Sequence, residues 1–457
     1  MSYIDDLKTV IREGTVLIEP QALEPYATDA SPGLHASPCV VVIPATEEEV
    51  RQVLLISHRY NIPIVPRGAG TGTTGGAIPL DNAIVISFER MNRILEIDQA
   101  NKMAVVQPGV ITGVLQDKVE AVGLFYPPDP ASLATCTIGG NVAENSGGPR
   151  ALKYGITGNY VIGLSGFLAD GTPFEAGGKR LKDVAGYDLV SLLVGSEGTL
   201  AVITRITLRL LALPAYQQDI LITFDDDEAA LGLLQQVYQA RIQPSTAEFM
   251  DRTCLEAVEA AWGTRLAYSD SQAQLIFQVD GWDKRAVFQE AVVIQSLAEK
   301  MGAKQVIIAV TPEERREIWT VRRALSGALK KLSPEKISHD ISVPPSRIID
   351  YMQAIRRLSR DTGVKILGYG HLGDGNIHVN ILKDAQENWL ELTTVIIDQI
   401  FRTAVDMGGT ITGEHGVGLT KKAYLKLMLS PAQYHISKQI KRAFDPKGLL
   451  NPGKIFE

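Results

Sequence analysis

Three glycine-rich stretches constrain the fold of this chain more than any other feature. They are residues 66–76 (PRGAGTGTTGG), 137–148 (TIGGNVAENSGG) and 194–200 (VGSEGTL). Glycine tolerates positive φ and lets backbone N–H groups approach an anion closely. The first stretch follows a predicted strand, but it contains no Gly-Lys-Ser/Thr and no clean dinucleotide fingerprint. Alone, it is consistent with either a phosphate site or a turn. Together, the three stretches predict one large cofactor that touches several loops.

Hydrophobic patterns predict two α+β regions. In the first region, apolar runs predict strands at 38–44, 62–66, 83–88, 94–97, 103–107, 163–169 and 200–210, and a capping pattern predicts a helix from Thr46 to about Tyr60. Beyond Pro214, predicted strands at 220–224, 246–250, 274–280 and 304–310 alternate with predicted helices at 227–240, 284–301 and 312–331. We therefore expect domains at 1–213 and 214–410, and a C-terminal segment at 411–457 that returns to the first domain.

Charge and cysteine content exclude several classes of protein. The net charge is −7, whereas nucleic-acid-binding proteins usually carry a basic excess. The three cysteines, Cys39, Cys136 and Cys254, are too far apart for an iron–sulfur cluster or a four-cysteine zinc site, and a disulfide scaffold is not expected. No signal peptide and no run of about 18 apolar residues occurs. We expect a cytoplasmic protein without a membrane span, which reaches a membrane only peripherally, through a partner.

Two histidines flank a predicted hairpin turn in residues 370–380 (GHLGDGNIHVN). If Asp374-Gly375 forms a two-residue turn, His371 lies directly opposite His378 on one face of the hairpin, and Asn380 shares that face. Such a pair can chelate one divalent metal, although two surface histidines are the alternative.

A second short motif, Gly413-Glu-His-Gly416, places a carboxylate beside an imidazole. On its own, Glu414-His415 would more often be a surface pair. Combined with His371 and His378, it favours a metal site, because two histidines and one carboxylate commonly hold zinc, iron or manganese with open positions.

The longest motifs resemble those of one flavoprotein family. PRGAGTGTTGG, PPDP, TIGGNVAENSGGPRALKYG, DVAGYDL and VGSEGTL resemble the FAD-linked D-2-hydroxyacid dehydrogenases, the group of the glycolate oxidase catalytic subunit and D-lactate dehydrogenase. The resemblance runs from about residue 37 to 457. It implies an α+β fold: a two-subdomain FAD-binding domain of the vanillyl-alcohol-oxidase type, a substrate cap with an antiparallel sheet, and a C-terminal helical tail.

The resemblance also implies how FAD is bound. Some wider relatives attach the flavin covalently through a His in the first glycine loop, where this chain has Thr71, so non-covalent FAD is expected. Residues 451–454 (NPGK) resemble the family's tail, which returns to the flavin; a plain turn is the alternative. The expected cofactor-binding residues are Pro66, Arg67, Gly68, Ala69, Gly70, Thr71, Gly72, Gly76, Pro130, Thr137, Gly140, Asn141, Asn145, Gly147, Gly155, Glu197, Gly198, Ile203 and Asn451.

The family's metal motifs, HLGDGNIH and TGEHG, are present here, so the resemblance implies His371, His378 and Glu414 as ligands of one divalent metal (Zn, Fe or Mn). It implies His415 as the acid/base group. Trp319-Thr-Val-Arg322 resembles the family's Trp-x-x-Arg, which makes Arg322 the expected anchor of the substrate carboxylate. Ser326, Asn380 and His415 complete the expected substrate-binding set. Neighbouring arginines on the same predicted helix, Arg315, Arg316 and Arg323, are expected to face solvent.

These residues predict oxidation of a small D-2-hydroxy acid, D-lactate or glycolate, to the 2-oxo acid, with hydride passing to the flavin. The chain has no second carrier of its own, so electrons must leave it, and the resemblance implies an iron–sulfur subunit, an electron-transfer flavoprotein or a quinone as the acceptor. Relatives that act on hydroxy diacids can carry Lys where this chain has Ser338, which disfavours a second substrate carboxylate, although Lys336 is close by. The alternatives are a larger acid such as D-2-hydroxyglutarate and a non-catalytic flavin-binding subunit. A metal hydrolase is disfavoured by the glycine stretches.

Overall fold

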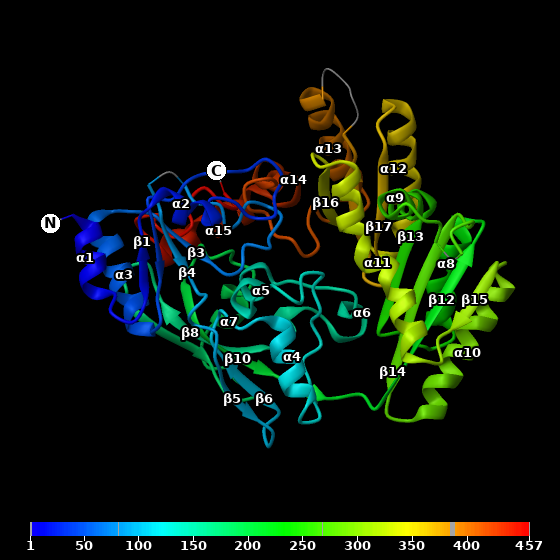
Figure 1. Cartoon of the computed structure of the whole chain (residues 1–457), viewed down its shortest axis with the longest axis horizontal. Coiled ribbons are helices and arrows are strands. Elements are labelled where there is room, and N and C mark those ends of the chain that lie inside the picture. Colours follow the sequence, from blue (N-terminus) through cyan, green and yellow to red (C-terminus); the bar gives the residue numbers. More distant parts are fainter. Residues whose placement is uncertain (1, 81, 267, 384–388, 457) are drawn as a thin grey trace. The chain divides into compact units, whose positions relative to one another are not determined.

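The computed structural model describes residues 2–80, 82–266, 268–383 and 389–456. These residues form two compact units. The first consists of Met1–Gly147, Ile156–Leu213 and Glu414–Glu457, and the second of Gly148–Gly155 and Pro214–Gly413. The chain therefore leaves the first unit twice and ends in it, which the sequence colours of Figure 1 make easy to follow.

The first sheet of the first unit has the strand order β1-β2-β4-β3. Its strands are β1 (Thr15–Leu17), β2 (Val40–Ile43), β3 (Ile64–Arg67) and β4 (Ile84–Ser87), and the last three run parallel. The buried runs VVVI and IVIS are typical of such strands, because both of their faces are covered. Two helices, α1 (Tyr3–Val10) and α3 (Glu47–Tyr60), pack on this core (Figure 1). The predicted helix end at Tyr60 is confirmed.

The second sheet of this unit is antiparallel, in the order β5-β6-β10-β8-β9. Its strands are β5 (Ile94–Asp98), β6 (Met103–Val106), β8 (Val161–Phe167), β9 (Pro173–Gly177) and β10 (Val202–Arg209). In β10, Thr204, Ile206 and Leu208 are buried while the residues between them are half-buried, as their alternation predicts. The first unit thus contains two sheets, and residues of both, such as Ile84 of β4 and Val202 of β10, belong to one core.

Short elements complete the first unit. They are α2 (Pro20–Leu23), η1 (Glu24–Tyr26), α4 (Thr112–Glu120), β7 (Leu124–Phe125), α5 (Ile138–Glu144), η2 (Thr157–Asn159), α7 (Leu189–Leu193), β11 (Leu211–Ala212), η4 (Lys422–Tyr424), α14 (Leu425–Met428) and α15 (Pro431–Phe444). Beyond α15, Leu450 forms a parallel bridge with Ile64 of β3, so the end of the chain packs against the first sheet.

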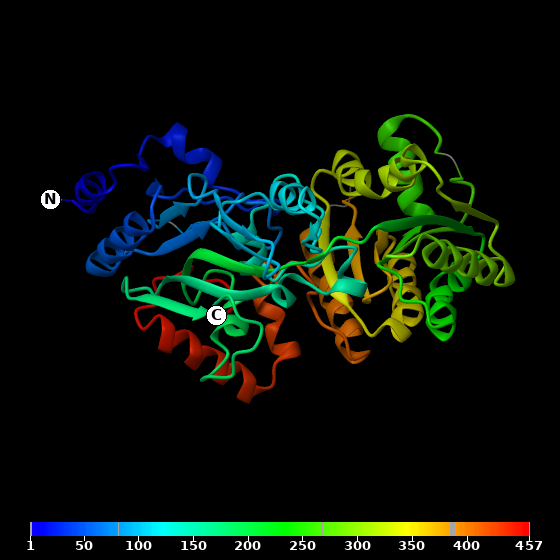
Figure 2. The same cartoon turned by 90° about the horizontal axis from the view of Figure 1, so that it is seen from below.

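The second unit contains one antiparallel sheet in the order β15-β12-β14-β13-β17-β18-β16. Its strands are β12 (Tyr216–Phe224), β13 (Thr246–Asp251), β14 (Ala273–Gly281), β15 (Gln305–Ile308), β16 (Ile337–Ser342), β17 (Ile366–His371) and β18 (Asn376–Ile381). Its helices lie on both faces (Figure 2); they are α6 (Ala151–Tyr154), α8 (Asp227–Gln239), α9 (Arg252–Trp262), α10 (Lys284–Lys300), α11 (Pro312–Leu332), η3 (Pro345–Arg347), α12 (Ile348–Thr362) and α13 (Trp389–Asp406). The antiparallel sheet expected for the cap is confirmed.

One face of this sheet is apolar on β12, β14 and most of β17, and polar at the end of β17 and on β18. Leu221, Met250 and Ile276 join a core that α9 and α11 complete. Farther along the same face, beneath α11, the strands present Glu248, His371 and His378. Charged side chains on a buried face require partners, so this region is the first place to look for a site. Within the described residues, no helix has the length and apolar character that crossing a membrane requires.

Candidate active site

The three glycine-rich stretches meet in the first unit. A Cβ atom on Gly68 would overlap the hydroxyl of Thr137, so the first stretch touches the second. The amides of Gly195 and Glu197 donate to the carbonyls of Val142 and Ala143, both at 2.8 Å, which joins the third stretch to the second. The meeting of the three stretches is what a single cofactor site requires.

The C-terminal tail closes on the same place. Nδ2 of Asn451 donates to the carbonyls of Gly76 (2.9 Å) and Glu197 (2.7 Å). Its Oδ1 is buried and has no hydrogen-bond partner among the described residues. Buried acceptors are normally satisfied, so this oxygen fits a site completed by a polar ligand such as FAD. The tail therefore contacts the first and third glycine-rich stretches, and its contact with a flavin stays a prediction.

Several predicted cofactor-binding side chains are engaged with the protein's own backbone. Arg67 donates to the carbonyls of Pro25 (3.2 Å) and Ala77 (3.4 Å) and braces the first glycine loop. Oδ1 of Asn145 accepts from the amide of Gly158, and the Glu197 carboxylate accepts from the amides of Val417 and Gly418, each at 2.7 Å. These side chains therefore hold the loops of the first unit in place.

The other predicted cofactor residues are distributed as follows. Pro66 lies in β3, and five lie in the loop that follows it: Ala69, Gly70, Thr71, Gly72 and Gly76. Thr137 caps α5, which holds Gly140 and Asn141, and Asn141 donates to Thr112 (2.7 Å). Gly198 has φ +67 and lies against Pro66, while Pro130, Gly147 and Ile203 lie elsewhere in the first unit. Gly155 belongs to the segment that packs with the second unit.

A substitution in the first glycine-rich stretch tests the predicted FAD-binding site. Gly68→Ala places a methyl group onto Thr137, and overpacking of this kind costs about 1–3 kcal/mol. We expect the dissociation constant for FAD to rise roughly 5- to 150-fold, measured as FAD per chain after dialysis and by flavin fluorescence titration. Gly327→Ala is the control, because a Cβ there has no neighbour within 4 Å. Equal FAD retention in both variants would contradict the prediction that this stretch binds FAD.

His371 and His378 lie on one face of the second unit's sheet, but not directly opposite each other. His371 pairs with Asn376 and His378 with Tyr369, so the predicted direct pairing is wrong. The physical reason is the turn: four residues, 372–375, connect β17 and β18 instead of two. The shift by two residues keeps the same face, and the ring centroids are 5.3 Å apart. Asn380 shares this face, as predicted.

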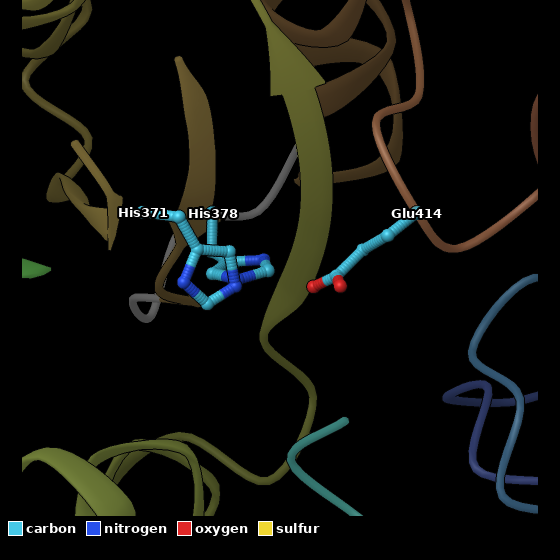
Figure 3. A group of neighbouring side chains, drawn as sticks. All are labelled: His371, His378 and Glu414. Atoms are coloured by element: carbon cyan, nitrogen blue, oxygen red, sulfur yellow. The ribbon is translucent and has the colours of Figure 1, made fainter. Parts of the chain in front are cut away.

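Glu414 follows a backbone segment that is fixed on the second unit. The amide of Gly413 donates to Asp340 (2.8 Å), which is fully buried. A side chain on Gly413 would overlap the amide of Asn376. His371, His378 and Glu414 each offer one ligand atom, and these atoms lie within 4.8 Å of one another. Figure 3 shows the carboxylate directed toward the two imidazoles. Two imidazoles and a carboxylate fit zinc, iron or manganese.

Glu248 of β13 is a functional candidate that the sequence analysis missed. It is fully buried, and its carboxylate joins two predicted site residues: Oε1 lies 2.5 Å from Nδ1 of His371, and Oε2 accepts from Nε of Arg322 at 2.6 Å. A carboxylate on Nδ1 orients the ring, as it commonly does for a histidine that ligates a metal through its other nitrogen. The available signal was an acid flanked by apolar residues, Ala247 and Phe249, in a predicted strand.

Arg322 is the one of the four neighbouring arginines on α11 that reaches this face. Its guanidinium lies over the ring of Tyr369, 4.9 Å from the centroid. The other three have different contacts: Arg315 with the carbonyl of Gln217, Arg316 with Glu313, and Arg323 with the ring of Trp319. Burial raises the pKa of Tyr369, and Arg322, Ser326 and Asn380 oppose that shift.

His415 is held within the first unit. Its carbonyl accepts from Thr74 of the first glycine stretch (3.1 Å), and Gly416 adopts φ +78 against Glu144. Nε2 of His415 lies 3.7 Å from Oε1 of Glu414, and its side chain is 25% exposed. The imidazole is therefore accessible, as an acid/base group must be.

Comparisons with known proteins extend these observations. Residues 213–455 match the family model "FAD linked oxidases, C-terminal domain", and residues 38–177 match "FAD binding domain". Glycolate oxidase subunit GlcD of Bacillus subtilis is 41% identical and covers 94% of this chain and 92% of its own. D-lactate dehydrogenase of Archaeoglobus fulgidus is 37% identical (100% and 99%), and D-2-hydroxyglutarate dehydrogenase of Stutzerimonas stutzeri is 30% identical (100% and 99%). Among solved structures, p-cresol methylhydroxylase is similar in fold, with a TM-score of 0.81 at 16% identity over 99% and 96% of the two chains.

Proposed function

Because the chain belongs to the FAD-linked oxidase family, we propose that it is an FAD- and metal-dependent dehydrogenase that oxidises a D-2-hydroxy acid to the 2-oxo acid. The family makes the chain an FAD-binding oxidoreductase. The metal, the substrate and the acceptor are the parts we propose. Thr71 supports non-covalent FAD, because it stands where a flavin-attaching histidine falls in some relatives.

The observation that carries the proposal is the group His371, His378 and Glu414. When bound, FAD supplies a hydride acceptor, and a divalent metal supplies the charge that makes an α-hydroxyl easier to deprotonate. The chain's own residues do the rest. Arg322, which also pairs with Glu248, binds the carboxylate, and Ser326 and Asn380 position the acid. His415 accepts the hydroxyl proton.

The relatives' names offer three acids: glycolate, D-lactate and D-2-hydroxyglutarate. They share the hydroxyl and carboxylate that the proposed site binds, and they differ in the group on C2. D-lactate and glycolate are the candidates that the sequence favours. Lys336 is the specific observation in favour of a larger acid, the second candidate.

Electrons must leave the flavin for an acceptor outside this chain. The three cysteines are free, and they lie too far apart in sequence to form a cluster. The word "subunit" in the name of the relative from Bacillus subtilis suggests a complex. We therefore propose an electron-accepting partner, either an iron–sulfur subunit or an electron-transfer flavoprotein, with a quinone as the alternative.

Anaerobic absorption spectroscopy tests the reaction. The purified protein is titrated with D-lactate, L-lactate, glycolate and D-2-hydroxyglutarate, before and after chelation. We expect the flavin band to bleach with glycolate or a D-acid but not with L-lactate, to remain unchanged after chelation, and to bleach again when a divalent metal is added. A flavin that none of these acids reduces would contradict the proposal.

A further inference from the structure

The tryptophan of the Trp-x-x-Arg motif has no part in the proposed reaction, yet it makes a specific buried hydrogen bond. Trp319 of α11 is 9% exposed, and its Nε1 donates to Oδ1 of Asp219 at 2.9 Å. Asp219 lies in β12 and is fully buried. Arg322 follows Trp319 by three residues, which places the two side chains on neighbouring turns of one side of the helix. The bond made by Trp319 therefore bears directly on where Arg322 lies.

The buried carboxylate of Asp219 is surrounded by N–H donors. Its Oδ1 also accepts from Nε2 of Gln278 at 2.8 Å, and its Oδ2 accepts from Nε2 of Gln217 at 3.2 Å. Nε of Arg315, one turn of α11 before Trp319, lies 3.7 Å from Oδ2. A buried carboxylate is costly unless it is hydrogen-bonded and paired with a cation. Two of the groups that meet this need come from α11, so one carboxylate contacts the helix at two successive turns.

Apolar contacts alone would not fix α11 in this position. Ile318, Leu325 and Leu329 join the core that α11 shares with α9 and the sheet. Packing of this kind is non-directional, whereas a hydrogen bond to an indole N–H requires a particular distance and angle. A helix rises about 1.5 Å per residue, so Trp319 lies only about 4.5 Å from Arg322 along the axis. The helix is therefore fixed within one turn of Arg322.

Arg322 depends on the placement of α11 because it has to meet several groups at once. Its Nε donates to Oε2 of Glu248, and its guanidinium lies over the ring of Tyr369. In the proposed function it also binds the substrate carboxylate. A displacement of about 1 Å in a group that positions the substrate can cost about a hundredfold in rate. A residue that fixes α11 thus affects substrate binding without touching the substrate.

We propose that Asp219 is a positioning residue: by binding Trp319 and pairing with Arg315, it fixes α11 on the sheet and so holds Arg322 in place for the substrate carboxylate. This inference rests on the proposed function, in which Arg322 binds that carboxylate. It adds a buried acid that lies outside the candidate metal-ligand group, and it assigns a role to the tryptophan of the motif.

Trp319→Phe tests the proposal, because it removes the indole N–H and keeps an aromatic ring in the core. We expect KM for the hydroxy acid to rise about 10- to 100-fold while kcat stays within about threefold, since a carboxylate anchor binds the ground state and the transition state alike. Asp219→Asn, which removes the charge that faces Arg315, should show the same division between KM and kcat. Trp262→Phe is the matched control, because Trp262 of α9 is 43% exposed, and it should keep the wild-type KM. A wild-type KM in both Trp319→Phe and Asp219→Asn would refute the role of Asp219.

A buried hydrogen bond in the first unit controls for lost stability. Ser57 of α3 is fully buried, and its hydroxyl donates to the carbonyl of Ile62 at 2.5 Å. Ser57→Ala should lower the melting temperature and leave KM unchanged. If Ser57→Ala raised KM as much as Trp319→Phe does, the increase would reflect lost stability, and the positioning role would be refuted.

An unfolding measurement separates this proposal from the function on which it rests. Arg322→Met lowers the free energy of unfolding of the wild type, because it leaves the carboxylate of Glu248 buried without its cation. In Trp319→Phe a displaced α11 has already weakened that pair, so Arg322→Met should cost less stability there than in the wild type. An equal cost in both backgrounds refutes the role of Asp219, even if hydroxy acids reduce the flavin. If no acid reduces the flavin of the wild type, the function fails, and the unfolding comparison alone decides whether Asp219 positions Arg322.

Discussion

His378→Ala is expected to lower the rate of flavin reduction by the hydroxy acid about a thousandfold or more, while FAD remains bound. The variant leaves His371 and Glu414 as the remaining members of a three-residue ligand group. Two ligands hold a divalent metal poorly, and the metal's contribution to the reaction is worth several kcal/mol, or a factor of ten for each 1.36 kcal/mol. Anaerobic stopped-flow spectroscopy measures the rate, and elemental analysis measures the metal.

His435→Ala is the matched control, since His435 is an exposed histidine on α15, away from the group. It should retain the wild-type rate, metal content and FAD. The ligand assignment would be wrong if His378→Ala kept both its metal and its rate. If the variant lost FAD as well, His378 would instead have a structural role.

The helices of the second unit show what sequence predicts well. Predicted spans of 227–240, 284–301 and 312–331 correspond to Asp227–Gln239, Lys284–Lys300 and Pro312–Leu332. Their periodicity and caps are local: Asp226, Asp283 and Thr311 each cap the following helix. The order of the seven strands depends on pairing between distant segments, and local patterns do not determine it.

The site shows the same division. The glycine stretches and the two histidine motifs stand out by composition, so the residues could be named in advance. The pairing of His371 with Asn376 could not be predicted. A register with His371 opposite Asn376 and one with His371 opposite His378 differ by two residues, so both keep the same side chains on the same face. Glu248 was missed because its role exists only through β13–β17 pairing, which brings it opposite His371 from a distant part of the sequence.

Glu248→Ala is expected to weaken metal binding about 10- to 100-fold and to lower the free energy of unfolding by about 3–5 kcal/mol. The first effect follows because His371 loses the carboxylate that orients its ring. The second follows because Arg322, whose side chain is 11% exposed, is left as a buried charge without its partner. Metal titration followed by flavin absorbance, and denaturant unfolding of the FAD-loaded protein, measure the two effects separately.

A double variant separates the two roles of Glu248, which are to orient His371 and to pair with Arg322. Glu248→Ala combined with Arg322→Met removes both charges, so much of the lost stability should return while metal binding stays weak. Glu256→Ala is the control, because Glu256 also pairs with an arginine, Arg252, but both side chains are accessible to solvent. It should lower the free energy of unfolding by at most about 1 kcal/mol. If the double variant recovered metal affinity together with stability, Glu248 would act only through Arg322. If metal affinity stayed low while stability returned, Glu248 positions His371, and a residue without contact to the metal or the substrate controls the metal affinity of the site.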